Sequence, residues 1–330
     1  MNNVQFYIFG YSDYIKNSLN DIIDLPEVKY YDLYYDQSRV KRITHRIFVS
    51  KHVKVFSKLI MPFWYKTYWK DKEPSLNEIP IIVLYEINPL SNKTQWIRKI
   101  KNQYPNAKII YIFTNIIDDH NLWRMKQILS ERNLYDLVLT FNMSDAEKYN
   151  IDYYEGVFSP KTISGEIMEN IEENDVYFCG LDKGRLPLLM DIYEHLEHMG
   201  IKCTFDVIFP QTIPSKEYKG IRLHSKLINN DEMLAYVQKS KCILEVMVDR
   251  SQPGSSLRMC ESIVYKKKLL TNNPYVMEKP FYNKKQMLFF DSPKDINKDF
   301  IYNKLQNSDY LETSLLSPKK LLGFICNKVL

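Results

Sequence analysis

Residues 249–273 read D-R-S-Q-P-G-S-S-L-R-M-C-E-S-I-V-Y-K-K-K-L-L-T-N-N. The small polar residues at 254–256 predict a loop that opens a helix, and the helix is expected to end in the lysines at 266–268 and to lead into a short apolar strand. The first backbone N–H groups of a helix have no partner within it, and the helix dipole adds positive potential there. The loop therefore predicts an anion site, with Glu261 placed to reach the hydroxyls of a sugar attached to the anion.

Buried strands alternate with helices before this stretch. Apolar runs predict strands at 4–9, 28–35, 79–87, 107–113 and 137–140. Helical spacing predicts helices at 14–23, 93–104 and 122–132. The polar segment 158–174, which holds Pro160 and Gly165, interrupts the pattern and predicts a domain boundary.

The alternation restarts beyond the boundary. Strands are predicted at 176–179, 202–209, 221–225, 242–248, 269–271 and 287–290. Helices are predicted at 186–199, 231–240 and 318–330. This order is typical of parallel, doubly wound sheets, so we expect an α/β fold of two Rossmann-like domains. We assign the first domain to 1–160, the second to 161–316, and a terminal helix, which could cross back to the first domain, to 317–330.

Composition excludes several classes of protein. The chain has 330 residues, enough for two domains, and its net charge of +5 is too small to imply nucleic-acid binding. None of the five cysteines form a C-x-x-C pair, which favours reduced thiols. His195 and His198 lie three apart on a helix without a further ligand in view, so no metal site is predicted. The N-terminus lacks the features of a signal peptide, and no apolar run approaches roughly 18 residues, so we expect a cytoplasmic protein.

A second loop, G-L-D-K-G-R, begins at Gly180 directly after a predicted strand. Ligands of open α/β sheets bind beyond the carboxyl ends of the strands. Gly180 and Gly184 would let the backbone approach a ligand, and Lys183 and Arg185 would offer cations to phosphate oxygens. If this loop and residues 254–256 share one sheet edge, they clamp a nucleotide diphosphate; the alternative is a solvated strand-to-helix turn.

Three segments of the second half together resemble the donor-binding half of bacterial GT-B glycosyltransferases, in particular those of capsule, O-antigen and exopolysaccharide pathways. The first is D-V-Y-F-C-G-L-D-K-G-R-L at 175–186, and the second is S-K-L-I-N-N-D-E-M-L-A-Y-V-Q-K-S-K-C-I-L-E-V at 225–246. The third and most specific is G-S-S-L-R-M-C-E-S-I-V-Y-K-K-K-L-L-T-N-N at 254–273. The first half of the chain matches the family only in architecture.

The resemblance implies two Rossmann-like domains facing across a cleft and a nucleotide-sugar donor as substrate, without an obligatory metal or other cofactor. It places the diphosphate on the two loops, the ribose on Glu261 and the base beside the segment at 227–228. The expected donor-site residues are Gly180, Lys183, Gly184, Arg185, Leu227, Ile228, Gly254, Ser255, Ser256, Arg258 and Glu261. From the residues alone, Glu261 could instead face solvent or serve as a partner for Arg258.

One departure from the family leaves the stereochemistry open. Retaining GT-B enzymes often carry two glutamates eight positions apart, but the residue eight positions before Glu261 is Pro253. Asp249 is near but out of register. The resemblance therefore does not decide between retention and inversion of the anomeric configuration.

The acceptor side is expected in the first domain, where an inverting enzyme would need a general base. Acidic and imidazole side chains near predicted strand ends are the candidates: Asp13, Glu86, Asp118 and His120. We rank Asp13 and Asp118 first. The alternative for each is an ordinary turn or cap residue.

The segment 39–70 is rich in Lys and Arg, has no acidic residue, and interleaves these cations with apolar and aromatic side chains. Such a basic amphipathic pattern suits an anionic membrane surface, and transferases that build polymers act on lipid-linked acceptors. We therefore expect a glycan or lipid-linked glycan acceptor and peripheral attachment to the inner face of the plasma membrane. The alternative is a core helix with a basic solvated face.

The sequence is also compatible with two other classes of function. A GT-B-like nucleotide-sugar epimerase would need catalytic carboxylates and His within one closed cleft. A non-catalytic α/β nucleotide-binding scaffold would neither hydrolyse nor transfer a donor.

Overall fold

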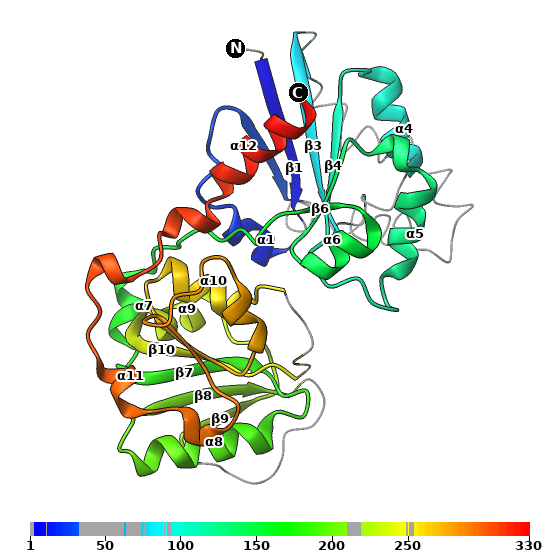
Figure 1. Cartoon of the computed structure of the whole chain (residues 1–330). Coiled ribbons are helices and arrows are strands. Elements are labelled where there is room, and N and C mark those ends of the chain that lie inside the picture. Colours follow the sequence, from blue (N-terminus) through cyan, green and yellow to red (C-terminus); the bar gives the residue numbers. More distant parts are fainter. Residues whose placement is uncertain are drawn as a thin grey trace. The chain divides into compact units, whose positions relative to one another are not determined.

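A computed structural model describes residues 3–10, 12–32, 63, 74–75, 77–86, 88, 90, 94–209, 219–248, 250 and 254–330. The chain divides into two compact units, 1–159 with 318–330, and 160–317. Each unit contains a parallel sheet with helices packed on it (Figure 1).

The described part of the first unit holds a six-stranded parallel sheet in the order β2-β1-β3-β4-β5-β6. Its strands are β1 (Asn3–Gly10), β2 (Val28–Asp32), β3 (Glu78–Tyr85), β4 (Lys108–Ile112), β5 (Leu137–Thr140) and β6 (Asp152–Tyr153). The α-helices in this described part are α1 (Asp13–Ser18), α4 (Thr94–Gln103), α5 (Leu122–Ser130), α6 (Met143–Tyr149) and α12 (Pro318–Val329).

Helices cover both faces of this sheet because its central strands are apolar on both sides. On one face, Tyr7 and Phe9 of β1 share a core with Trp96 of α4. On the other face, Phe6 belongs to a core that includes Leu321 of α12. The C-terminal helix therefore packs on the sheet of the first unit (Figure 1).

The described part of the second unit holds another six-stranded parallel sheet, in the order β12-β11-β10-β7-β8-β9. Its strands are β7 (Asn174–Leu181), β8 (Cys203–Ile208), β9 (Ile221–His224), β10 (Ser240–Glu245), β11 (Lys268–Thr271) and β12 (Met287–Phe289). Its α-helices are α7 (Gly165–Glu169), α8 (Leu186–His198), α9 (Asn230–Lys239), α10 (Leu257–Val264) and α11 (Lys298–Tyr302).

The two faces of the second sheet differ in character. One face packs α8 and α11 in an apolar core that includes Phe178, Leu189 and Phe205. The opposite face presents polar groups toward α9, where the Tyr177 ring stacks on Tyr236 at a centroid distance of 5.1 Å. Polar side chains buried on a sheet face need hydrogen-bond partners, so this face is where specific contacts are concentrated.

One helix boundary differs from the prediction. The helix predicted within 249–273, α10, ends at Val264. The expectation that it ends in the lysines at 266–268 was wrong. Lys266 has a left-handed backbone with φ of 50°, which terminates the helix. Lys268 already belongs to β11, where its buried ammonium group donates to the carbonyls of Phe300 and Ile301.

The strand orders place a topological switch point in each sheet, and ligands of open α/β sheets bind at such points. In the first sheet it lies between β1 and β3, and in the second between β7 and β10. The prediction of a doubly wound α/β fold in two domains is confirmed.

Candidate functional site

The two loops that the sequence singled out follow neighbouring strands at the switch point of the second sheet. β7 and β10 are hydrogen-bonded to each other, and Ile243 pairs with Tyr177 in their register. The Arg185 guanidinium links the two strand ends, because its Nη1 donates to the Val246 carbonyl at 2.8 Å. The structure thus brings the 180–185 loop and the start of α10 to the same sheet edge.

The start of α10 keeps backbone donors available. Ser256 is the N-cap, and its hydroxyl oxygen accepts from the Met259 N–H at 3.1 Å. The N–H groups of Leu257 and Arg258 have no acceptor among the described residues, as expected for the first turn of a helix. Gly254 is buried just before this turn. Unpaired N–H groups at a helix start are donors of the kind that bind anions.

Arg258 and Glu261 form a buried ion pair on α10. The Arg258 Nη1 lies 2.6 Å from the Glu261 Oε2 and 3.2 Å from the Sδ of Met233. The contact is not an aligned hydrogen bond, since neither carboxylate oxygen has a hydrogen-bond partner of good geometry. Burial raises the pKa of Glu261 to about 7, and Arg258 keeps it from rising further.

This geometry bears directly on the predicted ribose contact. Glu261 is 0 % exposed, so a ribose could reach its carboxylate only after Arg258 moved aside. The structure instead corresponds to the alternative interpretation, in which Glu261 is the ion-pair partner of Arg258.

Glu245, which the sequence reasoning missed, completes the polar group at this edge. It ends β10 and is 3 % exposed, and the Thr271 hydroxyl at the end of β11 donates to it. Burial raises the pKa of its carboxyl. The hydrogen bonds from Ser256 and Thr271 and the charges of Arg258 and Arg185 act in the opposite direction and lower it. The two arginines therefore face a buried carboxyl from both sides of the switch point.

The 180–185 loop differs from the start of α10, because its own aspartate occupies the donors. Asp182 accepts from the Gly184 N–H at 2.8 Å and from the Leu186 N–H at 2.9 Å. Gly184 and Lys183 have left-handed backbones, with φ of 82° and 46°, which folds the loop back onto Asp182. The Asp182 carboxylate thus occupies the Gly184 and Leu186 N–H groups without a ligand, while the Lys183 side chain is exposed.

Arg185 is largely committed to the protein backbone. Its guanidinium donates to the carbonyls of Leu181 and Asp182 as well as to Val246. A Cβ on Gly180 would lie 3.2 Å from the Phe178 Cζ and 3.4 Å from the Arg185 Nη2, so a larger residue there would require the Phe178 ring to shift slightly. Burial lowers the pKa of Arg185, although Asp182 opposes the shift. Its contact with a phosphate would have to add to these bonds.

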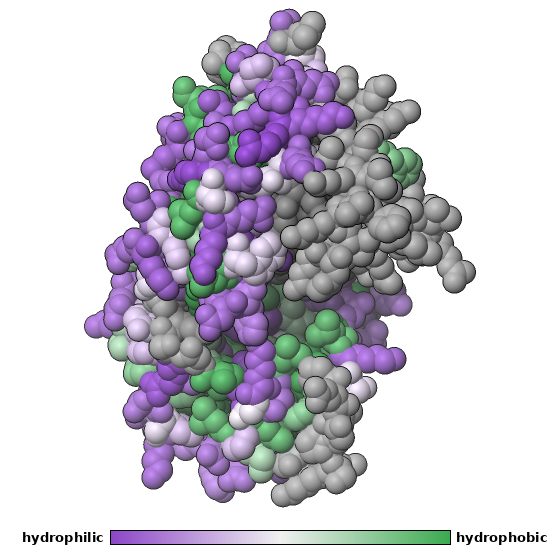
Figure 2. All heavy atoms as spheres, turned by 90° about the vertical axis from the view of Figure 1, so that its right-hand side faces the viewer, coloured by the Kyte–Doolittle hydropathy of each residue, from purple (hydrophilic) through white to green (hydrophobic). Residues whose placement is uncertain are grey.

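The predicted base-flanking residues follow β9 on the same sheet edge. Leu227 is 77 % exposed, and Ile228 is half-buried. Val248, which follows β10, is also exposed. Figure 2 shows hydrophobic residues among polar ones in the lower part of the view. Apolar side chains are therefore available on this unit for packing against a ligand ring.

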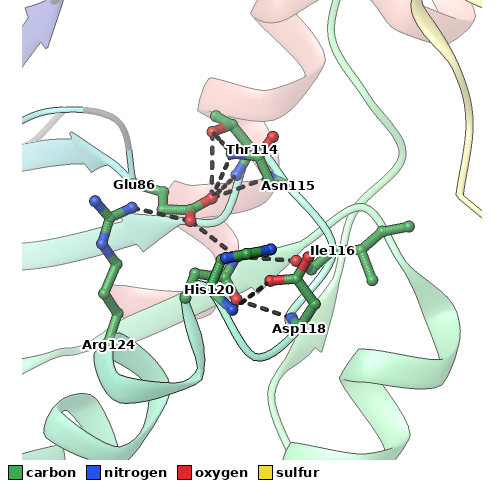
Figure 3. A network of polar contacts seen from close by, with 8 residues as sticks. Glu86, Thr114, Asn115, Ile116, Asp118, His120 and Arg124 are labelled. Carbon is green, nitrogen blue, oxygen red and sulfur yellow. Dashed lines mark hydrogen bonds and ion pairs between the residues drawn. The ribbon is translucent and has the colours of Figure 1, made fainter. Parts of the chain in front are cut away.

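In the first unit, Glu86 follows β3 and forms the centre of a buried network (Figure 3). It accepts from the backbone and side chains of Thr114 and Asn115, at 3.0 to 3.4 Å. On its other side Asn121 and Arg124 donate at 2.9 Å. A carboxylate saturated in this way organises the loop after β4 and has no capacity left to act as a general base.

Asp118 and His120 lie in the loop that Glu86 organises, and both are exposed. The Asp118 Oδ1 accepts from the His120 backbone N–H at 2.9 Å, which gives Asp118 the role of a turn residue (Figure 3). Asp13 begins α1, but its side chain lies outside the described residues.

Several predictions fall partly or wholly outside the described residues. The basic segment 39–70 does so except for Phe63, and so do Pro253 and Asp249. Within the described ranges, no group of three or more His, Cys, Asp or Glu side chains could hold a metal ion. No helix in the described part is long and apolar enough to span a bilayer.

Comparisons with known proteins add evidence on the fold. No family model matches the chain, and no curated protein matches its sequence. Among solved structures, UDP-N-acetylglucosamine 2-epimerase from Rickettsia bellii is similar with a TM-score of 0.54 and 12% identity, over 100% of this chain and 97% of that one. A UDP-forming α,α-trehalose-phosphate synthase from Burkholderia xenovorans is similar with a TM-score of 0.51 and 8% identity, over 99% and 96%. The N-terminal domain of Candida albicans trehalose-6-phosphate phosphatase gives 0.50 and 12%, over 99% and 97%.

At these identities the similarity shows the fold alone. The chain has a two-domain α/β fold with two parallel six-stranded sheets in its described part, of the GT-B type. The similarity extends over nearly the whole length of each protein compared, so it includes both domains.

Proposed function

We propose that this protein is a glycosyltransferase that takes a sugar from a nucleotide-diphosphate donor. The observation that carries the proposal is the open start of α10 at the switch point of the second sheet, with Arg258 beside it. Free N–H groups, the positive end of the helix and an adjacent cation are the features that bind phosphate groups.

The residues at this edge divide the work of binding the donor. The N–H groups of Leu257 and Arg258 and the Arg258 guanidinium would bind the diphosphate. Lys183, an exposed cation after β7, would approach it from the other loop. Gly254, Ser255 and Ser256 would shape the loop that carries these donors, and Arg185 would hold the ends of β7 and β10 together.

Two roles of Glu261 are compatible with donor binding. In the structure it holds Arg258 by the ion pair at 2.6 Å. A bound phosphate that draws Arg258 outward would free the carboxylate for the ribose hydroxyls, which are natural partners of a carboxylate. Either way, loss of Glu261 would disturb Arg258 and weaken donor binding.

The reaction follows from the chemistry of the donor. An acceptor hydroxyl attacks the anomeric carbon, the bond from that carbon to the diphosphate oxygen breaks, and the nucleoside diphosphate leaves with the electron pair. The N–H groups and cations at α10 would stabilise the charge that develops on the leaving group, with no obligatory metal. A base must take the hydroxyl proton in an inverting reaction, and Asp118 and Asp13 remain our proposals for that role.

The acceptor is proposed to be a glycan or lipid-linked glycan of surface-polysaccharide biosynthesis, bound by the first domain. The support is the resemblance of 176–273 to transferases of such pathways and the basic amphipathic pattern of 39–70. The same segment would hold the protein at an anionic membrane surface.

Proton NMR of the full chain with UDP-, GDP-, dTDP- and CMP-sugars tests the proposal. A transferase or its slow hydrolytic side reaction releases free nucleotide, with inversion or retention readable from the anomeric signal. An epimerase converts the sugar while it remains linked to the nucleotide or expels an altered sugar. Binding with neither change supports a scaffold, and no binding at all contradicts the proposal.

A further inference from the structure

A second polar cluster lies on the face of the second sheet that carries α9. Its centre is Asp206 of β8, whose side chain is fully buried. Asp206 accepts from the Tyr177 hydroxyl at 2.9 Å and from Nε and Nη2 of Arg222 at 2.7 and 2.5 Å. It also contacts the His224 Nε2 at 2.7 Å. The proposed diphosphate site does not use this cluster.

The contact with Asp206 determines which nitrogen of His224 carries the proton. An ionised carboxylate can only accept hydrogen bonds, so the Nε2 of His224 must be the donor. In the neutral ring the other nitrogen, Nδ1, is then an acceptor. In the neutral ring, the buried Asp206 carboxylate thus favours the tautomer of His224 that carries its proton on Nε2.

The Nδ1 of His224 is available to a ligand. It has no hydrogen-bond partner among the described residues and is not sealed from solvent, since 31% of the side chain is exposed. His224 is the last residue of β9, so it lies at the carboxyl edge of the sheet, where ligands of this type of fold bind.

The support beneath His224 is rigid. Arg222 lies over the Tyr236 ring at 4.3 Å and donates to the Tyr236 hydroxyl at 2.5 Å. Tyr236 in turn stacks on Tyr177 with 16° between the ring planes. Asp206 is thereby held by side chains from two strands, β7 and β9, and Tyr236 of α9 fixes Arg222 in turn. Such fixed support is typical of a side chain that reads a ligand.

We propose that His224 reads the nucleobase of the donor by accepting a hydrogen bond from a ring imino N–H. Uracil, thymine and guanine carry such a group, whereas cytosine and adenine do not. Leu227, three residues further along the same edge and 77 % exposed, supplies an apolar surface for the base. This inference rests on the proposed function, because it assigns the base of that donor.

The cluster could instead serve only to attach α9 to the sheet. That role would need Arg222, Tyr236 and Asp206, but it would not need an acceptor on the outer side of His224. The two roles differ in a measurable way: only base reading makes binding depend on the imino hydrogen of the ligand.

Calorimetric titration of the full chain with UDP, dTDP, GDP, CDP and ADP, and with N3-methyl-UDP and N1-methyl-GDP, tests the inference. We expect methylation of the imino nitrogen to weaken binding about tenfold, the value of one hydrogen bond. His224→Ala should reduce that difference to less than twofold. His198→Ala, which removes an exposed imidazole from α8, is the control and should leave the difference unchanged.

Two conservative variants exclude a purely structural effect. The amide oxygen of His224→Asn can occupy the place of Nδ1, so this variant should keep part of the discrimination against methylated bases. His224→Gln places its amide nearer to Nε2 and should keep less. Thermal unfolding of each variant checks that the fold persists.

Several results would overturn the inference. Equal binding of UDP and N3-methyl-UDP, discrimination that survives His224→Ala, or tightest binding of CDP or ADP would each do so while the donor function stands. Failure of every nucleoside diphosphate to bind would overturn both this inference and the proposed function.

Discussion

Glu86 and Glu261 are both buried, both lie near the carboxyl edge of a parallel sheet, and both pair with an arginine. Glu86 accepts hydrogen bonds from Thr114, Asn115, Asn121 and Arg124. Glu261 has the ion pair with Arg258 and no aligned hydrogen bond. Burial raises the pKa of Glu261 to about 7.

The difference separates a structural carboxylate, which has its hydrogen-bond partners within the fold, from one whose oxygens lack them. Buried polar groups in folded proteins nearly always have hydrogen-bond partners, and the exceptions are concentrated at functional sites. The hydrogen-bond partners of Glu86 among the described residues all come from its own domain. The Arg258–Glu261 pair has unused hydrogen-bonding capacity next to an open helix start, which a phosphate or a sugar hydroxyl could use.

The largest expected effect is on the Glu86 side of this comparison. Glu86→Ala removes the partner of a partly buried arginine and leaves the donors of Asn121 and Arg124 unpaired, so we expect a loss of about 3–5 kcal/mol in unfolding free energy. All four tryptophans lie within residues 1–159, so urea unfolding followed by tryptophan fluorescence reports this domain.

A surface pair in the same domain provides the control. Glu131→Ala breaks the pair of Glu131 with the half-exposed Arg98, at 3.0 Å, and should cost no more than about 1 kcal/mol. If Glu86→Ala costs no more than the control, the view of Glu86 as the structural centre of its loop is wrong.

The next prediction concerns the pH dependence that Glu261 contributes. The folded chain holds the Glu261 proton up to about pH 7, whereas the unfolded chain releases it near the ordinary value of 4.5. The stabilisation from protonation is therefore complete below about pH 4.5 and is lost as the pH rises through 7. Relative to Glu261→Gln, the wild type should lose up to about 3 kcal/mol of unfolding free energy between pH 5 and 8.

Far-UV circular dichroism of urea unfolding at several pH values measures this difference, because the second unit has no tryptophan. A difference between wild type and Glu261→Gln that stays constant across the range would show that the carboxyl of Glu261 is ionised throughout.

The smallest predicted effect concerns Asp182. Its carboxylate accepts hydrogen bonds from N–H groups of its own loop, as the Glu86 carboxylate accepts them from the loop after β4. Asp182→Ala removes the acceptor of the Gly184 and Leu186 N–H groups and should cost about 1 kcal/mol, as for a side chain that accepts from N–H groups at the start of a helix. Nucleotide affinity should not fall, because these donors are already occupied in the wild type. Asp182→Asn should recover part of the stability; a loss of affinity in both variants would contradict this account of the loop.

Much of the fold could be predicted from the sequence, because strands buried on both faces leave continuous apolar runs. The runs at 79–87 and 107–113 became β3 and β4 with small shifts at the ends. The end of α10 was missed because three consecutive lysines favour a helix terminus. In the structure, the left-handed residue Lys266 closes the helix before them, and the Lys267 N–H donates to the Ser262 carbonyl at 2.8 Å.

The site was predictable only in part. Loop chemistry indicated the switch-point edge, but the sequence could not show that Glu261 faces Arg258 inside the protein. Glu245 and Asp206 were overlooked although each interrupts an apolar strand, in C-I-L-E-V and F-D-V-I. A charged residue within a buried strand is a signal that the sequence does carry, while its partners, such as Arg222, become visible only in the fold.

The central claim, a nucleotide-diphosphate site at the start of α10, is tested most directly by calorimetric titration with matched nucleoside diphosphates and monophosphates. The double variant Arg258→Met with Glu261→Gln removes the ion pair without leaving a buried charge. We expect it to weaken diphosphate binding about 100-fold, as for loss of a charge-assisted contact, with a smaller effect on the monophosphate, while Arg98→Met has none. Diphosphate affinity within threefold of the wild type in the double variant would contradict the claim.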